Sequence, residues 1–286
     1  MTTTIDLDSY FQRIGYTGER QATLDTLCGL HDRHTAAIAF ENLNPLLRWP
    51  VPLDLPALQQ KMIHDGRGGY CYEQNLLFSH VLKALGFQVT GLAARVLWNA
   101  PEGAITARSH MLLRVDLGEG PYIADVGFGV LTLTGPLRLQ PDVEQSTPHE
   151  LFRLVRARGG FVMQAMLRGT WKPLYRFDLE EQFPPDYEVA NWYVSTHPAS
   201  RFINGLIAAR PAPYRRYALF NNELTVHHLN GNSDRRVLAN AAELRQTLQD
   251  TFGLTLPDAP ELDAVLTRLL EGALGASDAH ARRTNV

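Results

Sequence analysis

Apolar positions recur with helical spacing through the first third of the chain. Between Asp6 and Gly15, four apolar side chains fall on one face of a helix that Asp6 can cap and Gly15 can end. A second periodic stretch carries Cys28 on its apolar side, which predicts a small core residue there. The clearest helix follows Cys71 and has Gly86 as its natural end. The pattern therefore predicts a helical N-terminal segment.

From Phe87 the apolar pattern changes to short runs rich in β-branched and aromatic residues. Turn residues such as glycine, proline and aspartate separate these runs. Strands this short and this close together favour an antiparallel barrel or a strongly curved sheet. The expected strands lie within residues 87–98, 110–117, 122–128, 150–157, 160–171 and 173–179.

The last third of the chain mixes the two patterns. It reads as strands at 215–220 and 223–229, followed by helices at 241–253 and 259–275, and we expect the polar end at 277–286 to fray. The predicted fold class is therefore α+β. The predicted domains are a helical bundle (1–89), a central β-barrel (90–190) and a C-terminal α/β part (191–286).

Composition narrows the class of protein. The chain has 286 residues, of which 45% are hydrophobic and 20% charged, as is ordinary for a globular protein. Its formal net charge of −3 provides no global positive field for nucleic acid or an acidic membrane. Two cysteines are too few for a disulfide framework or a thiolate metal cluster, so we expect no metal. With no signal-like N-terminus or membrane-length apolar run, we expect a cytoplasmic location.

The most informative segment is RGGYCYEQN, from Arg67 to Asn75. Its two glycines allow a tight turn and a close approach of the backbone. Cys71 comes next but one, at the opening of the strongest helix, where unpaired N–H groups and the helix dipole favour a thiolate. Cys71 is therefore a candidate nucleophile.

A thiolate nucleophile needs a base, and the base needs an orienting group. His110 opens one expected strand and Asp125 ends the next, so a hairpin would bring their side chains together. His80 is the main rival base, but it lies about two and a half turns along the same helix as Cys71, too far to reach its sulfur. The pattern alone leaves open a buried cysteine, a capping aspartate and an unrelated surface histidine.

Several segments in a fixed order resemble the arylamine N-acetyltransferases. They are RGGYCYEQN, the isolated His110, the run DVGFG (125–129), HTAAIAFENL (34–43) and STHPASRF (195–202). Ala39 stands where that family often has a proline, and His197 where serine is common. The resemblance spans most of the first 205 residues.

The resemblance implies a helical bundle, a β-barrel and an α/β lid around a catalytic core like that of cysteine proteases and transglutaminases. It implies Cys71, His110 and Asp125 as the catalytic triad. The implied reaction uses acetyl-CoA as co-substrate to acetylate arylamines, arylhydrazines or arylhydroxylamines in a ping-pong exchange through an acetyl-cysteine. No metal or tightly bound cofactor is implied, and the chain could act as a monomer or a homodimer.

The resemblance also assigns supporting positions. An Arg67–Glu41 pair, completed by Asn42, would hold the cysteine turn. The expected walls of the aromatic-amine pocket are Phe40, Tyr70 and Phe128, and the expected contacts of the cofactor are Trp98, Ser109, Gly127, Gly129 and Phe202.

Two other functions remain open at this point. A cysteine hydrolase or transglutaminase-like enzyme could use the same triad on peptides, but peptide cleavage does not call for the GFG run or STHPASRF. A catalytically inactive binding protein of the same fold would not need a thiol, an imidazole and a carboxylate at these positions.

Overall fold

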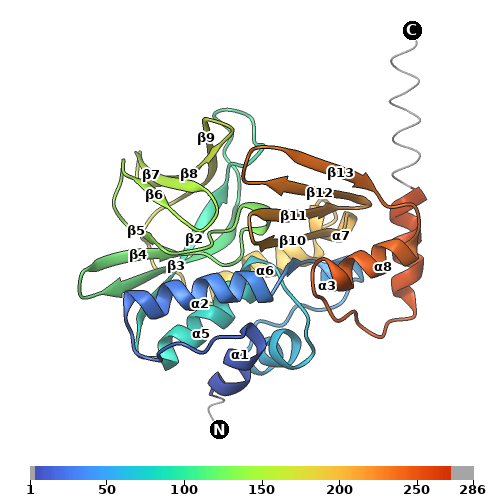
Figure 1. The fold of residues 1–286 in the computed structure, drawn as a ribbon, viewed down its shortest axis with the longest axis horizontal. Coiled ribbons are helices and arrows are strands. Elements are labelled where there is room, and N and C mark those ends of the chain that lie inside the picture. The colour runs from blue at the N-terminus through green and yellow to red at the C-terminus, as the bar shows by residue number, and fades with distance from the viewer. Residues whose placement is uncertain (1–3, 272–286) are drawn as a thin grey trace.

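The computed structural model describes residues 4–271, and its N-terminal part is helical (Figure 1). Asp6 caps the first helix by accepting a hydrogen bond from the Ser9 N–H, and Gly15 ends it at a φ of +63°. Both ends are therefore as predicted. The helical elements are α1 (Leu7–Ile14), α2 (Leu24–Ala37), α3 (Leu43–Leu46), α4 (Leu55–Gln59), a π-helical turn (Gln60–His64) and α5 (Cys71–Ala84).

The expected burial of Cys28 is wrong, because its side chain is exposed. Helix α2 instead buries a stripe that includes Leu27, Leu30, His31 and His34. On the buried side, both ring nitrogens of His34 and Nε2 of His31 have hydrogen-bond partners inside the protein. The buried face of α2 therefore includes polar residues, which a pattern of apolar positions alone does not predict.

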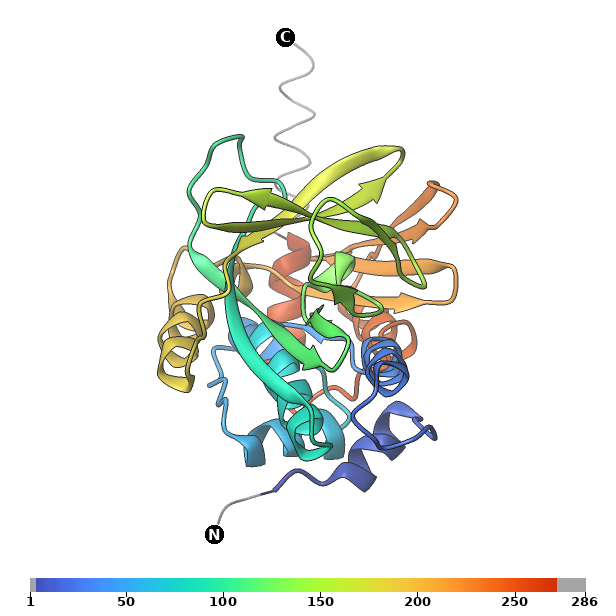
Figure 2. The same ribbon diagram turned by 90° about the vertical axis from the view of Figure 1, so that its left-hand side faces the viewer.

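The central part is one antiparallel sheet of eight strands that curls into a nearly closed barrel (Figure 2). Its strand order is β5-β4-β3-β2-β9-β8-β7-β6. The inward-facing side chains, among them Leu112, Phe152 and Met163, form a separate apolar core. The strands are β2 (Gln88–Val96), β3 (Arg108–Leu117), β4 (Gly120–Ala124), β5 (Leu137–Arg138), β6 (Glu144–Ser146), β7 (Leu151–Ala157), β8 (Gly160–Leu167) and β9 (Thr170–Phe177).

The C-terminal part combines a second sheet with helices and confirms the predicted mixed pattern. The predicted helix at 259–275 begins at residue 261 and continues at least to 271; its remainder and the segment 277–286 lie outside the described residues. The named elements are α6 (Pro184–Thr196), α7 (Arg201–Asn204), β10 (Ile207–Ala212), β11 (Arg215–Phe220), β12 (Glu223–His228), β13 (Ser233–Val237) and α8 (Ala241–Asp250).

The first and last thirds of the chain share that second sheet. Strand β1 (Phe40–Glu41) pairs with β10, with Phe40 opposite Ala209. Helix α6 runs through residue 190, where the sequence places a boundary. The three-domain division stays a prediction. The pairing of β1 with β10 holds Phe40 and Glu41 against the C-terminal sheet, and Phe40 also forms a bridge with Gly69, two residues before Cys71.

Candidate active site

Cys71 is the first residue of α5. The two glycines before it, Gly68 and Gly69, let the chain make the tight turn that leads into this helix. A Cβ on Gly68 would lie 2.1 Å from the carbonyl oxygen of Ala39, so only glycine fits there. The helix start is closed by the carboxylate of Glu73, which accepts a hydrogen bond of 3.0 Å from the Tyr70 N–H. The Cys71 side chain is 4% exposed, with its sulfur 3.8 Å from the carbonyl oxygen of Ser109.

The β3–β4 hairpin brings His110 and Asp125 together. The strands pair as far as Leu113 opposite Ala124, and the chain leaves β4 at Asp125. His110 Nε2 lies 2.7 Å from Asp125 Oδ2, and the two side chains are 3% and 0% exposed. The sequence prediction that these two residues meet is therefore correct.

The electrostatics of this pair favour charge on both partners. Burial alone would lower the pKa of His110, but the Asp125 carboxylate and hydrogen bonding to Asp125 and Cys71 outweigh it and raise the pKa to about 10. Burial would raise the pKa of Asp125, yet the neighbouring imidazole and hydrogen bonds from Gly127 and Asn75 lower it. At neutral pH the site therefore holds an imidazolium–carboxylate pair beside the Cys71 thiol.

Aromatic rings surround the reacting groups. Phe128 meets His110 edge-on at 5.0 Å between ring centroids. Phe202 stacks on Tyr70 at 5.4 Å and lies 6.1 Å from Phe40. Tyr70 is 0% exposed and its hydroxyl donates to Asn191 Oδ1, so its ring supports Phe202 from inside the protein. The sequence reasoning missed one ring, Tyr175 of β9, which lies 5.0 Å from the His110 ring.

Tyr175 carries no distinguishing signal in the sequence. It is one of several aromatic residues in an alternating strand, and only the curl of the barrel turns it toward His110. Trp98 is the second residue after β2 and packs against the barrel core, as does Phe128. Gly129 has a φ of +82° and faces the ring of Phe40.

Gly127 has a structural use that differs from the expected approach of a cofactor. A Cβ on this residue would lie 2.7 Å from Cys71 Cα and 2.9 Å from Asn75 Nδ2. The missing side chain therefore lets the loop after β4 pack directly on the start of α5. This contact brings Asp125 and Cys71 into one site.

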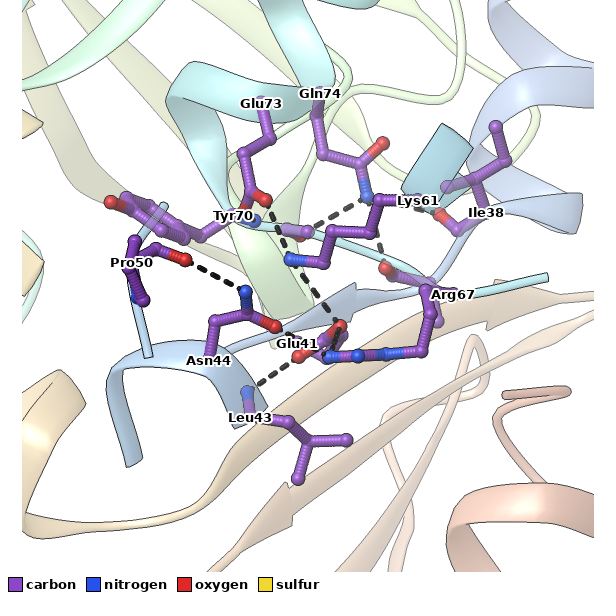
Figure 3. A network of polar contacts seen from close by, with 12 residues as sticks. Ile38, Glu41, Leu43, Asn44, Pro50, Lys61, Arg67, Tyr70, Glu73 and Gln74 are labelled. Atoms are coloured by element: carbon purple, nitrogen blue, oxygen red, sulfur yellow. Dashed lines mark hydrogen bonds and ion pairs between the residues drawn. The ribbon is translucent and has the colours of Figure 1, made fainter. Parts of the chain in front are cut away.

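Behind the cysteine turn lies a network of buried charges (Figure 3). Arg67 Nη2 lies 2.8 Å from Glu41 Oε1, as the sequence predicts, and the Arg67 and Glu41 side chains are 7% and 0% exposed. Lys61 Nζ lies 3.7 Å from the same Glu41 oxygen and 2.5 Å from Glu73 Oε1. Burial would raise the pKa of Glu41, but Arg67 and Lys61 lower it to about 2.

Asn42 does not complete this network, and that expectation is wrong. Its Nδ2 donates to the carbonyl oxygens of Phe202 and Gly205, both at 2.7 Å, and its Oδ1 accepts from the Ile207 N–H. The second side-chain partner of Arg67 is Asn44, whose Oδ1 lies 2.9 Å from Nη2. The two asparagines are two residues apart, and the turn into α3 directs them to opposite sides.

Within residues 4–271, His, Cys, Asp and Glu side chains form no group that could hold a metal ion. Over the same residues, no helix has both the length and the apolar character to cross a membrane. The reactive groups that the site brings together are a thiol, an imidazole and a carboxylate, contributed by α5, β3 and the loop after β4. Such a series is typical of enzymes that carry an acyl group on cysteine.

Similarity to known proteins shows which family the chain belongs to among enzymes that carry an acyl group on cysteine. A family model described as N-acetyltransferase matches residues 23–261. An arylamine N-acetyltransferase of Mycobacterium tuberculosis is 44% identical over 271 residues, or 93% of this chain and 95% of that protein. The corresponding enzyme of Escherichia coli is 40% identical over 254 residues, or 88% and 90% of the two chains.

A solved structure agrees with these relatives. The Mycobacterium marinum arylamine N-acetyltransferase in complex with CoA superposes with a TM-score of 0.89 at 42% identity, covering 92% of this chain and 99% of that chain. The chain belongs to the arylamine N-acetyltransferase family.

The buried network predicts a large loss of stability in Glu41→Gln. The amide keeps the shape of the side chain but leaves Arg67 without its counter-charge in the interior, so the free energy of unfolding should fall by about 3–5 kcal/mol. Asp8→Asn is the matched control, since it breaks the exposed pair with Arg20 and should cost under about 1 kcal/mol. Urea unfolding measures the free energy of unfolding of both variants. Equal losses would show that the buried pair stabilises the protein no more than the exposed pair does.

The contact between Gly127 and α5 predicts that Gly127→Ala is harmful. The added methyl group must push the loop away from Cys71, which should cost about 1–3 kcal/mol of stability and roughly 10-fold or more in acetyl transfer. Gly118→Ala, in the β3–β4 turn, meets open space and serves as the control. Normal turnover of Gly127→Ala would mean that the loop and helix need not touch.

Proposed function

We propose that this chain transfers an acetyl group from acetyl-CoA to arylamines, arylhydrazines or arylhydroxylamines through an acetyl group carried on Cys71. The observation that carries the proposal is the 2.7 Å contact of His110 with Asp125, with the Cys71 thiol as the third member. Family membership supports the substrate class, and a Salmonella typhimurium relative is named for both N-acetyltransferase and N-hydroxyarylamine O-acetyltransferase activity. The solved relative bound to CoA supports the acyl donor.

In the first half-reaction, the Cys71 sulfur attacks the acetyl carbonyl carbon of acetyl-CoA. The bond between that carbon and the CoA sulfur breaks, and the leaving thiolate takes a proton from the His110 imidazolium. Asp125 stabilises the charged ring before the step and holds its Nε2, so that Nδ1 is the nitrogen free to exchange protons. One thioester replaces another, and the step is nearly balanced in free energy.

In the second half-reaction, the neutral amine nitrogen attacks the acetyl-cysteine. His110 accepts the N–H proton, and Cys71 leaves as a thiolate when the new C–N bond is complete. The backbone N–H of Cys71, in the first turn of α5, is the proposed donor to the oxyanion. The amide product is much more stable than a thioester, and this difference drives the exchange forward.

The remaining roles follow the surroundings of the triad. Phe40 and Phe128 offer flat faces to an aromatic amine, with Tyr70 supporting Phe202 behind them. Trp98 and Phe202 are the proposed contacts of the pantetheine side of CoA, and Ser109 is the proposed hydrogen-bond donor near the thioester. Gly129 is proposed to let CoA approach the backbone closely, whereas the lack of a side chain at Gly127 serves the packing of the loop on α5. The division into three domains, a cytoplasmic location that keeps Cys71 reduced, and a monomeric or homodimeric state are parts of the same proposal.

Intact-mass measurement of the protein with acetyl-CoA alone tests the proposal. We expect one acetyl adduct on Cys71 that is discharged when an aniline or hydrazine is added. Cys71→Ser should form no adduct and lose at least about 10³-fold in turnover, since a hydroxyl ionises far less readily than a thiol. Cys28→Ser removes the exposed thiol and should still carry the adduct.

Three outcomes would contradict the proposal. Peptide hydrolysis without an acetyl adduct would favour a cysteine hydrolase, and neither adduct nor hydrolysis would leave a non-catalytic binding protein. An adduct that follows Cys28 instead of Cys71 would also reject the assigned nucleophile.

A further inference from the structure

Every polar atom of Asp125 has a partner. The carboxylate binds His110 through Oδ2, and through Oδ1 it accepts from the Gly127 N–H at 3.0 Å and from Asn75 Nδ2 at 3.1 Å. The carbonyl oxygen accepts from the Thr132 hydroxyl at 3.0 Å. The N–H donates to Nε2 of His31 at 3.2 Å. The mechanism above uses the first of these contacts, and His31 is the partner that comes from farthest away in the chain.

His31 lies on α2, and its ring is entirely buried against Phe78, at 5.7 Å between centroids and an interplanar angle of 84°. Because Nε2 accepts a hydrogen bond from a backbone N–H, the proton of the neutral ring must be on Nδ1. Burial lowers the pKa of His31 to about 3, although the nearby Asp125 acts in the opposite direction, and His34 adds to the lowering. The ring is therefore a neutral acceptor throughout the physiological range.

The other ring nitrogen of His31, Nδ1, helps to explain why a histidine and not an apolar residue stands at this position. Nδ1 has no hydrogen-bond partner among residues 4–271, although it is buried. A buried donor without a partner destabilises a protein, and leucine or methionine would fill the same space without that cost. The acceptor that His31 offers to Asp125 is what distinguishes it from an apolar residue at this position.

The Asp125 N–H needs such an acceptor because the strand ladder stops one residue earlier. Ala124, opposite Leu113, is the last paired residue of β4, and the chain then turns toward α5. Without His31 this peptide group could rotate, and the carboxylate would rotate with it. A misplacement of about 1 Å in a catalytic group can cost roughly 10²-fold in rate.

We propose that His31 is a positioning residue for the reaction: its neutral ring fixes the Asp125 peptide, and thereby the direction in which the carboxylate meets His110. The N-terminal helical part thus contacts Asp125 directly through His31 of α2, in addition to supplying Cys71 from α5. The inference rests on the proposed function only in giving Asp125 a part in catalysis.

The first test compares His31→Leu with His31→Gln. Leucine removes the acceptor, whereas the side-chain oxygen of glutamine can replace it. The readout is the pH dependence of Cys71 alkylation by iodoacetamide, measured in a Cys28→Ser background so that one thiol reacts. We expect the leucine variant to need a higher pH for half-maximal alkylation and to acetylate Cys71 roughly 10- to 100-fold more slowly. Glutamine should restore most of both values.

His34→Leu is the matched control. His34 is on the same helix and equally buried, and it binds the Tyr10 hydroxyl and Gln74 but not Asp125. Because this substitution leaves the Asp125 N–H with its acceptor, we expect the alkylation profile of His34→Leu to stay at the wild-type pH. A His31→Leu profile that coincides with the His34→Leu profile, with acetylation within two-fold, would reduce His31 to a core residue.

A measurement on the unmodified protein keeps the proposal testable if His31→Leu does not fold. In ¹⁵N-histidine spectra between pH 5 and 8, His31 should remain neutral with Nδ1 protonated and Nε2 accepting. A protonated Nε2 could not accept from Asp125 and would overturn the proposal. Neither the alkylation profile nor the spectra require acetyl-CoA, so failure of the proposed transferase function would be recognised separately.

Discussion

The ion pair between His110 and Asp125 is the interaction on which the rest of the site depends. Both side chains are buried, so each charge has lost most of its hydration, and neither would be stable there alone. The pair is maintained because the carboxylate also accepts from Gly127 and Asn75, which satisfy the oxygen that His110 does not reach. These contacts hold a cationic ring beside Cys71.

The same principle extends to the turn behind the nucleophile. Glu41 and Glu73 face Lys61 and Arg67 in a largely enclosed cluster, and Glu73 also accepts from the backbone just before Cys71. Desolvation raises the pKa of Glu73, and Lys61 counteracts this effect. Buried charges thus hold two parts of the triad in place. The His110–Asp125 pair orients the imidazole, and the cluster of glutamates with Lys61 and Arg67 holds the start of α5, where Cys71 lies. In each case the partners come from separate segments, so the site forms only when the segments have packed.

Local signals in the sequence predicted the parts of the fold that local physics determines. Asp6 and Gly15 bound the first helix as their capping preferences require, and the strands predicted at 87–98, 110–117 and 150–157 lie close to β2, β3 and β7. The strand predicted at 160–171 is wrong in its second part, because the chain turns at Arg168–Gly169 and Trp171 belongs to β9, and the strand predicted at 122–128 ends at Ala124. The hairpin that joins His110 to Asp125 was predictable because its strands are short and adjacent in the sequence.

The features that the sequence did not reveal depend on distant contacts. Helix α6 was not predicted. It begins with two prolines, which occupy its first turn, where their missing N–H groups cost nothing. Strand β10 contains Pro211, which is tolerated because β1 covers Ala208 and Ala209 and not this residue. The positions of Asn42 and Tyr175 likewise follow from packing between segments far apart in the chain.

The central claim is that the His110 ring is a cation at neutral pH, and a ¹⁵N NMR titration of its ring nitrogens tests it most directly. Because its pKa is raised to about 10, both nitrogens should remain protonated from pH 6 to about pH 9 and lose a proton only above that range. A neutral His110 ring at pH 7 would contradict the account, since the thiolate would then lack the charge that stabilises it.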